Sequence, residues 1–442
     1  MIGRILKSTI VVYIVTVILM PAHGHTLEYS TGQVLDFMTK KPIKGAFVTL
    51  DRDVILTDEN GMFVTKSQSN RVAVRAHGYV RAEQPIGTQV VNAPLQIHLM
   101  PFEPKALYLS FFGIGSRKLR ESALKLIEET EINALVIDVK GDRGNIVFRS
   151  SIPLATEIGA QKIIPVKDMR GLIKSLRDRG IYTIARIVVF KDNPLASAKT
   201  ELAVKSRNGL VWRDKENLAW TDPSLKKVWD YNISIAVEAA EYGFDEIQLD
   251  YVRFPDAAGL KFSIPNTQEN RLNAITGFLM QARKALIPYN VFLAADIFGY
   301  VCWNINDTLI GQKLEDLIPY LDYISPMLYP SGFRYGIPGF RNPVASPYEI
   351  VYFSLERART RTHLSAIRFR PWLQAFRDYA FDRRFFTGQE IRKQIDAAEK
   401  FGAKGWMLWN PHNVYSGDGL KYKRGQAAAP DTNNTGKVDK RT

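Results

Sequence analysis

The sequence predicts an α/β protein, a (β/α)8 TIM barrel preceded by a small all-β sandwich domain. Three observations support this class. The chain has 442 residues, enough for one large domain and one small one. Residues 27–100 alternate short apolar runs with turn residues, whereas from Lys105 onward apolar runs alternate with amphipathic helical stretches. Repeated strand–helix units of the second kind are typical of a parallel sheet.

The first 24 residues have the order of a secretory signal peptide. Arg4 and Lys7 precede an apolar run over residues 10–20, and small residues follow it. The run is shorter than the roughly 20 residues that a membrane span needs. We therefore expect cleavage and export to a bacterial periplasm or exterior, with membrane contact only if the segment stays uncleaved. The single cysteine, Cys302, allows no intrachain disulfide.

Residues 27–100 predict a β-sandwich. The stretch VILTDENGMFVT predicts two strands that form a hairpin around Asn60-Gly61. This segment resembles the carboxypeptidase regulatory-like domain, which implies a non-catalytic spacer or adhesion unit. The resemblance rests on Thr31-Gly32, Pro42-Ile43-Lys44-Gly45-Ala46, Thr57-Asp58-Glu59-Asn60-Gly61 and His77-Gly78-Tyr79.

Residues 105–420 predict the barrel. The eight expected strands lie at 106–112, 134–140, 182–190, 246–255, 291–300, 323–330, 370–376 and 405–411. Amphipathic helices are expected between them, one over 223–242, capped by Thr221 or Asp222, and one over 269–286. A doubly wound sheet is the rival fold, but its glycine-rich nucleotide turn has no good match, because FGIGS lacks the third glycine.

The net charge and the C-terminal tail do not identify a binding partner. The net charge is +14, of which the first 24 residues contribute +2 and residues 421–442 contribute +4, which leaves +8. This balance suits an anionic polymer but is also compatible with solubility alone. No stripe of Lys and Arg with interleaved aromatic residues is present, so nucleic acid is not an expected partner. Residues 421–442 have no apolar period and are expected to be disordered.

The barrel segment lacks the residues of several kinds of chemistry. Its only histidines are His363 and His412, too few for the clustered ligands of a metal-dependent hydrolase. A Ser or Cys nucleophile would need a base oriented by an acid, and no phosphate-binding loop is present. We therefore expect no metal and no cofactor, and carboxylates remain as the reactive groups.

Four acids fall at the carboxyl ends of predicted strands, where barrel active sites lie. They are Asp138, Asp192, Asp250 and Asp296. Asp322 opens the sixth strand and so belongs to the opposite end. Aromatic and amide side chains surround the same mouth: Trp303, Tyr329, Trp372, Gln374, Trp409 and Asn410. Carboxylates ringed by flat side chains are typical of a site that cleaves sugars, because the rings stack on pyranoses.

The barrel segment also resembles a known family. The motifs VIDVKGDRGNI, ARIVVFKD, GFDEIQLDYVRFP, AADIFGY, ISPMLYPS, PWLQAF and GWMLWN together resemble a bacterial glycoside hydrolase domain family with a barrel fold, over residues 105–415. In related barrel clans the nucleophile ends the fourth strand and the acid ends the fifth. The resemblance therefore implies that Asp250 is the nucleophile and Asp296 the acid/base. Further substrate-binding candidates are Asp138, Asp192, Arg186, Gln248, Arg253 and Gln374.

Each assignment has a structural alternative. Asp250 could be paired with Arg253 or Arg186, and Asp296 could be a buried, hydrogen-bonded acid. Asp138 could form a supporting ion pair with Lys140 and Arg143, Asp192 could begin a turn before Pro194, and Trp372 and Trp409 could be core residues.

The function has alternatives too. The leading hypothesis is an exported hydrolase that acts on a polysaccharide. A barrel that binds glycan without cutting it, and glycosyl transfer with the same residues, remain open alternatives.

Overall fold

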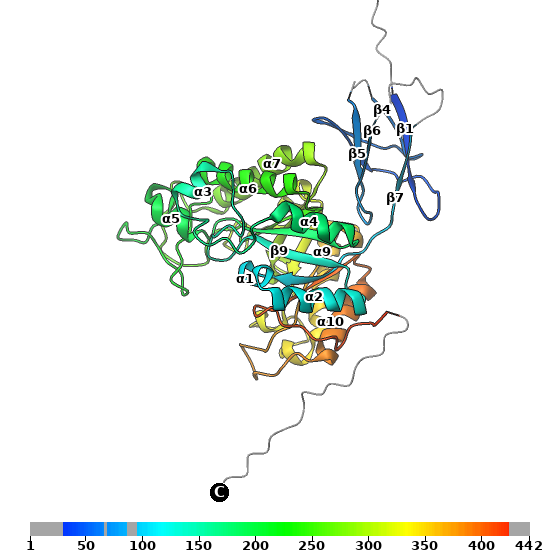
Figure 1. Cartoon of the computed structure of the whole chain (residues 1–442). Helices are drawn as coiled ribbons and strands as arrows, with labels where there is room; N and C mark the ends of the chain where they lie inside the picture. Colours follow the sequence, from blue (N-terminus) through cyan, green and yellow to red (C-terminus); the bar gives the residue numbers. More distant parts are fainter. Residues whose placement is uncertain (1–29, 66–68, 86–94, 424–442) are drawn as a thin grey trace, which may run out of the picture.

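The computed structural model describes residues 30–65, 69–85 and 95–423, and it shows a small all-β domain followed by a closed (β/α)8 barrel (Figure 1). The expected signal peptide and residues 424–442 of the expected tail lie outside these residues. Residues 421–423 are part of the barrel domain, since Tyr422 bridges to Thr130 and the N–H of Lys423 donates to the carbonyl of Glu129 at 2.9 Å.

The all-β domain is a sandwich of two sheets, with strand orders β4-β1-β7 and β3-β2-β5-β6. Val34 and Ile97 from one sheet pack against Val48 and Val72 from the other, and all four are fully or almost fully buried. The strands are β1 (Ser30–Asp36), β2 (Phe47–Leu50), β3 (Asp53–Leu56), β4 (Met62–Thr65), β5 (Arg71–Arg75), β6 (Ala82–Pro85) and β7 (Leu95–Leu99).

The expected hairpin at Asn60-Gly61 is wrong in its pairing. Strand β3 pairs with β2, and β4 pairs with β1, so the turn carries the chain from one sheet to the other. The Asp58 carboxylate accepts the backbone N–H groups of Asn60 and Met62, and Gly61 has φ +69°. A Cβ on Gly61 would lie 2.5 Å from the carbonyl of Val34. The turn residues were recognised correctly, but turn chemistry alone does not decide which strands pair.

Eight parallel strands close the barrel in sequence order, as predicted. They are β8 (Lys105–Leu109), β9 (Ala134–Lys140), β10 (Tyr182–Val188), β11 (Glu246–Asp250), β12 (Phe292–Phe298), β13 (Tyr323–Met327), β14 (Trp372–Gln374) and β15 (Trp406–Trp409). Strand β11 is half as long as expected, because Tyr251 has φ +51° and turns the chain away directly after Asp250.

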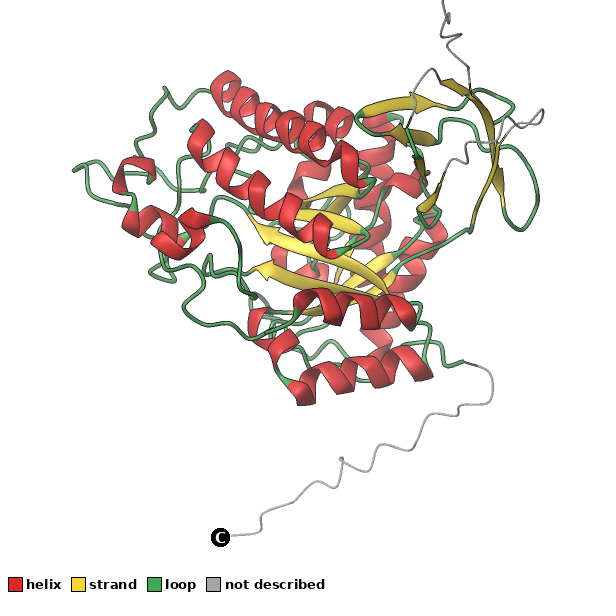
Figure 2. Cartoon of the chain, turned by 45° about the horizontal axis from the view of Figure 1, so that its top comes forward, coloured by secondary structure: helices red, strands yellow, loops and turns green. Residues whose placement is uncertain are grey.

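Helices surround the barrel (Figure 2). The main ones are α2 (Arg117–Glu129), α4 (Met169–Asp178), α6 (Lys226–Tyr242), α7 (Gln268–Leu286), α9 (Pro347–Thr362) and α10 (Gly388–Phe401); the short ones are α1 (Phe111–Gly115), α3 (Pro153–Glu157), α5 (Asn193–Ala198) and α8 (Leu314–Leu317). Helix α6 begins three residues later than predicted, because Asp222 accepts the N–H groups of Ser224 and Ser263 instead of capping it. Within the described ranges, none of the helices combines the length and the apolar character of a membrane span.

The inward side chains of β11 are charged or polar. In β11 the inward residues Glu246, Gln248 and Asp250 alternate with Ile247 and Leu249, which are fully buried against the helices. The acid at the start of the strand is neutralised within the barrel, where Arg370 donates to Glu246 and its guanidinium lies over the ring of Tyr323.

The sandwich covers the amino-terminal ends of the barrel strands. Arg81 donates to the carbonyls of Gly243, Phe244 and Tyr289 at 3.1–3.3 Å, and the Gly78 N–H donates to the Tyr323 hydroxyl at 3.1 Å. A second set of contacts centres on Asp322, which lies 3.8 Å from Arg75 and 3.9 Å from His77. Asp322 therefore lies at the end of the barrel opposite the strand C-termini, as its position in the sequence predicts.

Candidate active site

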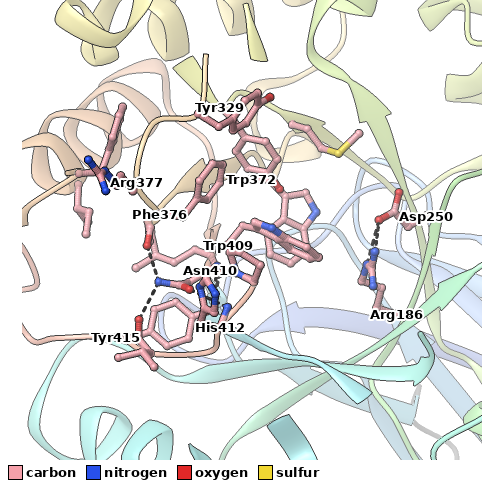
Figure 3. A pocket seen from close by; sticks show the side chains of 18 of the residues that line it. Arg186, Asp250, Tyr329, Trp372, Phe376, Arg377, Trp409, Asn410, His412 and Tyr415 are labelled. Carbon is pink, nitrogen blue, oxygen red and sulfur yellow. Dashed lines mark hydrogen bonds and ion pairs between the residues drawn. The ribbon is translucent and has the colours of Figure 1, made fainter. Parts of the chain in front are cut away.

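A pocket of about 1030 Å³ opens at the carboxyl ends of the barrel strands. Asp250 and Arg186 lie on one part of its wall, and Tyr329, Trp372 and Trp409 lie on an adjoining part, with the Arg186 guanidinium 4.9 Å from the ring centroid of Trp409 (Figure 3). These five residues come from β10, β11, β14 and β15 and from the segment after β13. The closed barrel thus brings together side chains up to 223 positions apart in the sequence.

Arg186 is the centre of the charged wall. Its guanidinium, 1% exposed, donates to three carboxylates: Asp138 Oδ1 at 2.7 Å, Asp142 Oδ1 at 2.7 Å and Asp250 Oδ2 at 2.6 Å. These carboxylates outweigh the effect of burial and raise the pKa of Arg186 well above its ordinary value. One buried cation therefore holds the three acids in fixed positions.

Asp250 lines the pocket and is 5% exposed. Its Oδ2 accepts two hydrogen bonds from Arg186, and its Oδ1 accepts the N–H of Tyr251 at 2.6 Å. Of the two partners that the sequence left open, Arg186 is the one found, and Arg253 forms no ion pair with Asp250 in the described structure. These hydrogen bonds fix the orientation of the Asp250 carboxylate.

Asp138 lies beneath the pocket and does not line it. Besides Arg186 it accepts the Tyr108 hydroxyl at 2.9 Å and the Phe111 N–H at 3.0 Å. Burial raises the pKa of Asp138 to about 6, with Arg186 opposing the shift and Asp142 adding to it. The expected partners Lys140 and Arg143 were wrong, because Lys140 reaches Asp192 instead.

Asp296 is the second acid at this level of the barrel, and it is 1% exposed. Its Oδ1 accepts the indole N–H of Trp372 at 2.7 Å, whereas its Oδ2 has no hydrogen-bond partner among the described residues. Burial, and then repulsion from Asp250, raise the pKa of Asp296 well above its ordinary range, although Arg186 and Trp372 oppose the shift. These surroundings favour the protonated carboxylic acid, and Oδ2 is the oxygen that is not used in a hydrogen bond.

The two acids occupy equivalent positions on neighbouring strands. Leu249 pairs with Ala295. Asp250 and Asp296, the next residue of each strand, are therefore neighbours across two strands whose backbones are about 4.8 Å apart. Their environments differ: a guanidinium holds Asp250, and an indole N–H holds Asp296. Two acids whose surroundings separate their protonation states are typical of an acid–base pair.

Aromatic rings form the part of the wall next to the charged residues. Trp409 stacks on Tyr108 with ring centroids 4.0 Å apart, and Trp372 meets Trp409 edge to face at 5.4 Å. Trp372 is 1% exposed, and Trp409 is half-buried. Tyr329 completes this wall, and burial raises its pKa well above the ordinary value, with Asp296 and Asp250 contributing further. The Tyr329 hydroxyl therefore stays protonated near both acids.

Two further residues predicted from sequence line the pocket. Asn410 donates to the carbonyls of Ala375 and Val414 at 2.7 and 2.9 Å, so its amide shapes the loop after β15. Arg253 lies two residues beyond Tyr251, and its guanidinium is over the rings of Trp220 and Tyr251.

Besides Asp138 and Asp296, four predicted residues do not line the pocket. Gln248 is fully buried and donates to the Ser325 hydroxyl at 3.1 Å, and Gln374 is fully buried and donates to Ser331 at 2.7 Å. Trp303 packs against the core outside the barrel and donates to Ser354 at 2.9 Å. These three side chains support the barrel and its loops.

Asp192, the fourth, has the structural role that the sequence left open, at the start of the turn before Pro194. Its Oδ1 caps α5 by accepting the N–H of Leu195 at 3.0 Å, and its Oδ2 pairs with Lys140 at 2.5 Å. Both carboxylate oxygens are used, and the side chain is fully buried.

The sequence analysis missed several residues of the site. Tyr108 and Asp142 complete the Arg186 cluster, and Phe376 and Tyr379 extend the aromatic wall with rings only 9° from parallel. Tyr108 alternates with outward residues of β8, which is a usable signal for an inward position. The other three lie in loops after strands, where the pattern of apolar residues gives no direction.

The charged groups offer no evident place for a metal ion. Among the described residues, His, Cys, Asp and Glu nowhere gather in a group of three or more suited to hold one. The acids Asp138, Asp142 and Asp250 form ion pairs with Arg186.

A parallel barrel with paired acids and an aromatic wall at its carboxyl end defines a glycan-active barrel protein. Residues 106–415 match the family described as "Putative glycosyl hydrolase domain". This match spans most of the chain, and the protein belongs to that family. A search of curated protein sequences gives no match.

Three solved structures are similar to parts of this chain. The glycoside hydrolase domain of PgaB (BpsB) from Bordetella bronchiseptica is 15% identical, with a TM-score of 0.52, over 71% of this chain and 95% of that one. A hypothetical protein from Ruminiclostridium thermocellum is 44% identical over 43% of this chain and 96% of its own, with a TM-score of 0.39. A class V chitinase from Pseudomonas fluorescens Pf-5 is 14% identical over 71% and 97%, with a TM-score of 0.42.

Proposed function

We propose that this protein is an exported glycoside hydrolase that cleaves a polysaccharide, with Asp250 as nucleophile and Asp296 as acid/base. One observation carries the proposal: Asp250, which Arg186 holds on the pocket wall, lies on the strand next to that of Asp296, a buried acid whose pKa is raised and whose Oδ2 has no hydrogen-bond partner among the described residues. Family membership supports the class of reaction. The leader pattern in residues 1–24 supports export.

The chemistry follows from the two protonation states. An Asp250 oxygen attacks the anomeric carbon and forms a glycosyl ester while the bond to the leaving oxygen breaks. The proton of Asp296 passes to that oxygen, which leaves Asp296 ionised. A water molecule then gives its proton to Asp296 and attacks the anomeric carbon, which releases Asp250 and restores both groups.

Arg186 has a part in both states. It orients Asp250 before attack, and once Asp250 has formed the ester, Asp138 and Asp142 still balance the positive charge of Arg186. Tyr329 and Trp409 offer flat surfaces on which a pyranose stacks. The Trp372 indole fixes the carboxyl plane of Asp296.

A second function is a barrel that binds glycan without cutting it. The observation that favours it is the burial of Asp296, which is 1% exposed and does not line the pocket. Proton donation to a bound sugar requires Trp372 or Tyr329 to shift. If these side chains do not move, the pocket binds sugar and Asp250 alone cannot complete the reaction.

Incubation of the purified protein with a panel of bacterial envelope and secreted polysaccharides, followed by size chromatography of the products, separates the two functions. A hydrolase shortens one of these polymers, and the Asp250→Asn variant binds that polymer but leaves its length unchanged. Binding by the wild type with no change in length after prolonged incubation would refute hydrolysis and support the binding function. Products longer than the substrate would indicate transfer.

A further inference from the structure

Arg253 differs from three buried arginines of the barrel domain. Arg186, Arg271 and Arg370 each form an ion pair with a buried acid. Arg253 forms none with any residue that the structure describes, and its one hydrogen bond goes from Nη1 to the neighbouring carbonyl of Phe254 at 3.2 Å. A guanidinium has five N–H donors, so most of its capacity is unused.

The position of Arg253 follows from the chain geometry after β11. The left-handed conformation of Tyr251 ends the strand, and the next residues alternate: Tyr251 and Arg253 line the pocket, whereas Val252 and Phe254 are buried. The alternation therefore presents Arg253 to the same cavity that Asp250 lines.

Two aromatic rings hold the guanidinium. The Arg253 Cζ lies 5.0 Å from the ring centroid of Trp220 and 5.2 Å from that of Tyr251. Stacking on rings restrains the long side chain without using its N–H donors. Burial lowers the pKa of Arg253, with Tyr251 and Asp250 opposing the shift, so its charge is only partly compensated.

The other charges on the pocket wall are accounted for differently. Asp250 is paired with Arg186, and Glu216 with Lys191. Arg377, on the far side, also lacks an ion pair within the described ranges, and its guanidinium lies 4.8 Å from the ring centroid of Phe385. The unpaired charges of the pocket are thus positive, and both lie on aromatic rings.

We propose that Arg253 binds an anionic group of the substrate, and that the substrate is a polysaccharide bearing carboxylate or sulfate groups. The planar fork of a guanidinium forms paired hydrogen bonds with either group. The sugar that stacks near Asp250 places its acidic substituent at Arg253, and Arg377 meets a second anion further along the chain. This substrate class rests on the proposed function, but anion recognition is measurable without turnover.

Binding to the Asp250→Asn variant tests the proposal, because that variant isolates recognition from cleavage. The probes are alginate, polygalacturonate and κ-carrageenan oligosaccharides, with the carboxyl-reduced or desulfated form of each as its neutral counterpart. We expect one anionic probe to bind at least tenfold more tightly than its counterpart, and the preferred probe distinguishes carboxylate from sulfate. Equal or weaker binding of all three anionic probes relative to their counterparts would overturn the proposal.

Substitution identifies the residue responsible. Arg253→Gln in the same background should weaken binding of the preferred anionic probe at least tenfold and leave the neutral form unchanged, and Arg253→Lys should recover only part of the loss. Arg341→Gln, at an exposed site outside the pocket, makes the same change in net charge and is the matched control. Equal losses in Arg253→Gln and Arg341→Gln would refute a specific site.

Thermal melting of each variant verifies folding. If Arg253→Gln does not fold, Arg253→Lys decides, because an unchanged affinity of that variant for the anionic probe would refute paired hydrogen bonds from the Arg253 guanidinium.

The two proposals fail separately. Cleavage of a neutral polymer, with no preference for an anionic probe, would leave the hydrolase standing and remove the anionic substrate. Tight, Arg253-dependent binding without cleavage of any probe would leave anion recognition standing and favour the binding function.

Discussion

Arg186 directs two donors at one oxygen of Asp250: its Nη2 lies 2.6 Å and its Nε 2.9 Å from Oδ2. The other oxygen of Asp250 accepts only the N–H of Tyr251, at 2.6 Å, among the described residues. The pair therefore has two consequences that can be measured separately. It stabilises the fold, and it orients the carboxylate where the pocket opens.

Asp250→Asn tests both consequences. Loss of the charged partner should lower the free energy of unfolding by about 1–3 kcal/mol, since Arg186 retains Asp138 and Asp142. Turnover should fall by at least about 10³-fold, because the amide cannot attack the sugar. Urea unfolding and initial rates on the polymer identified by product sizing measure the two effects.

Asp142→Asn is the matched control for Asp250→Asn. It removes another Arg186 partner, but from a carboxylate whose side chain is 41% exposed, so the cost in stability should stay below about 1 kcal/mol. Turnover should remain within about tenfold of the wild type. If Asp250→Asn keeps wild-type turnover, Asp250 is only a structural acid.

The sequence predicted the position of Asp250 more securely than its partner. Alternation in β11 directs Gln248 and Asp250 inward, and this follows from strand geometry alone. The choice between Arg186 and Arg253 depends on Tyr251, whose left-handed backbone separates Arg253 from the strand. A tyrosine with positive φ has no clear sequence signal, so the end of β11 and the lack of an ion pair between Arg253 and Asp250 could not be predicted.

A similar limit applies to the rest of the site. The existence and order of the barrel strands could be predicted from apolar runs, and with them the strands that carry Asp138, Asp296 and Trp409. Whether Gln374 lines the pocket or supports it depends on Ser331, which approaches from another loop. Contacts between loops are set by tertiary packing, which no local pattern in one sequence records.

Asp296→Asn should stabilise the protein in a pH-dependent manner. The folded-state pKa of Asp296 is raised above the unfolded value of about 3.9. Between these two pKa values the folded state binds more protons, so the free energy of unfolding of the wild type falls as pH rises. The asparagine variant does not titrate, so its free energy of unfolding does not fall in this way, and its amide oxygen still accepts the Trp372 indole N–H. Urea unfolding should show it more stable than the wild type at pH 7, with the difference shrinking towards pH 4.

The same substitution should impair turnover, and less so for a glycoside whose leaving group needs no protonation. Initial rates of the variant on an aryl glycoside, whose leaving group needs no protonation, and on the natural polymer therefore separate a loss of acid catalysis from a change in folding. A variant that is less stable at pH 7 than the wild type would show that Asp296 is ionised in the folded state and would contradict its role as proton donor.

Asp322→Asn should have the opposite effect on stability. Burial alone would raise the pKa of Asp322, but Arg75, Arg283 and His77 hold it below the ordinary value. A lowered folded-state pKa contributes stability above the unfolded pKa of about 3.9, and this contribution is lost as pH falls through the folded value. The variant should therefore be destabilised at pH 7 and should approach the wild type in acid.

Turnover by folded Asp322→Asn should be unchanged, because Asp322 lies where the sandwich meets the barrel, opposite the pocket. Circular dichroism melts over a pH series, with initial rates measured well below the melting temperature, separate the two effects. A large loss of turnover in a folded variant would show that the sandwich influences the pocket through the barrel, which would contradict the spacer role that its sequence predicts.

The last prediction compares two exposed tyrosines. Tyr379 lines the pocket, is 54% exposed and lies nearly parallel to Phe376, whereas Tyr335 is 80% exposed and lies outside the pocket. An aromatic contact contributes about 0.5–1.5 kcal/mol, so Tyr379→Ala should weaken polysaccharide binding by roughly 2–13-fold. Tyr335→Ala should leave it unchanged, and neither should alter stability by more than about 0.5 kcal/mol, since both rings are exposed. Calorimetric titration in the Asp250→Asn background measures affinity without cleavage. Equal affinities for both variants would show that the sugar chain does not extend over the loop that carries Tyr379, and the binding surface would then be confined to Tyr329, Trp372 and Trp409.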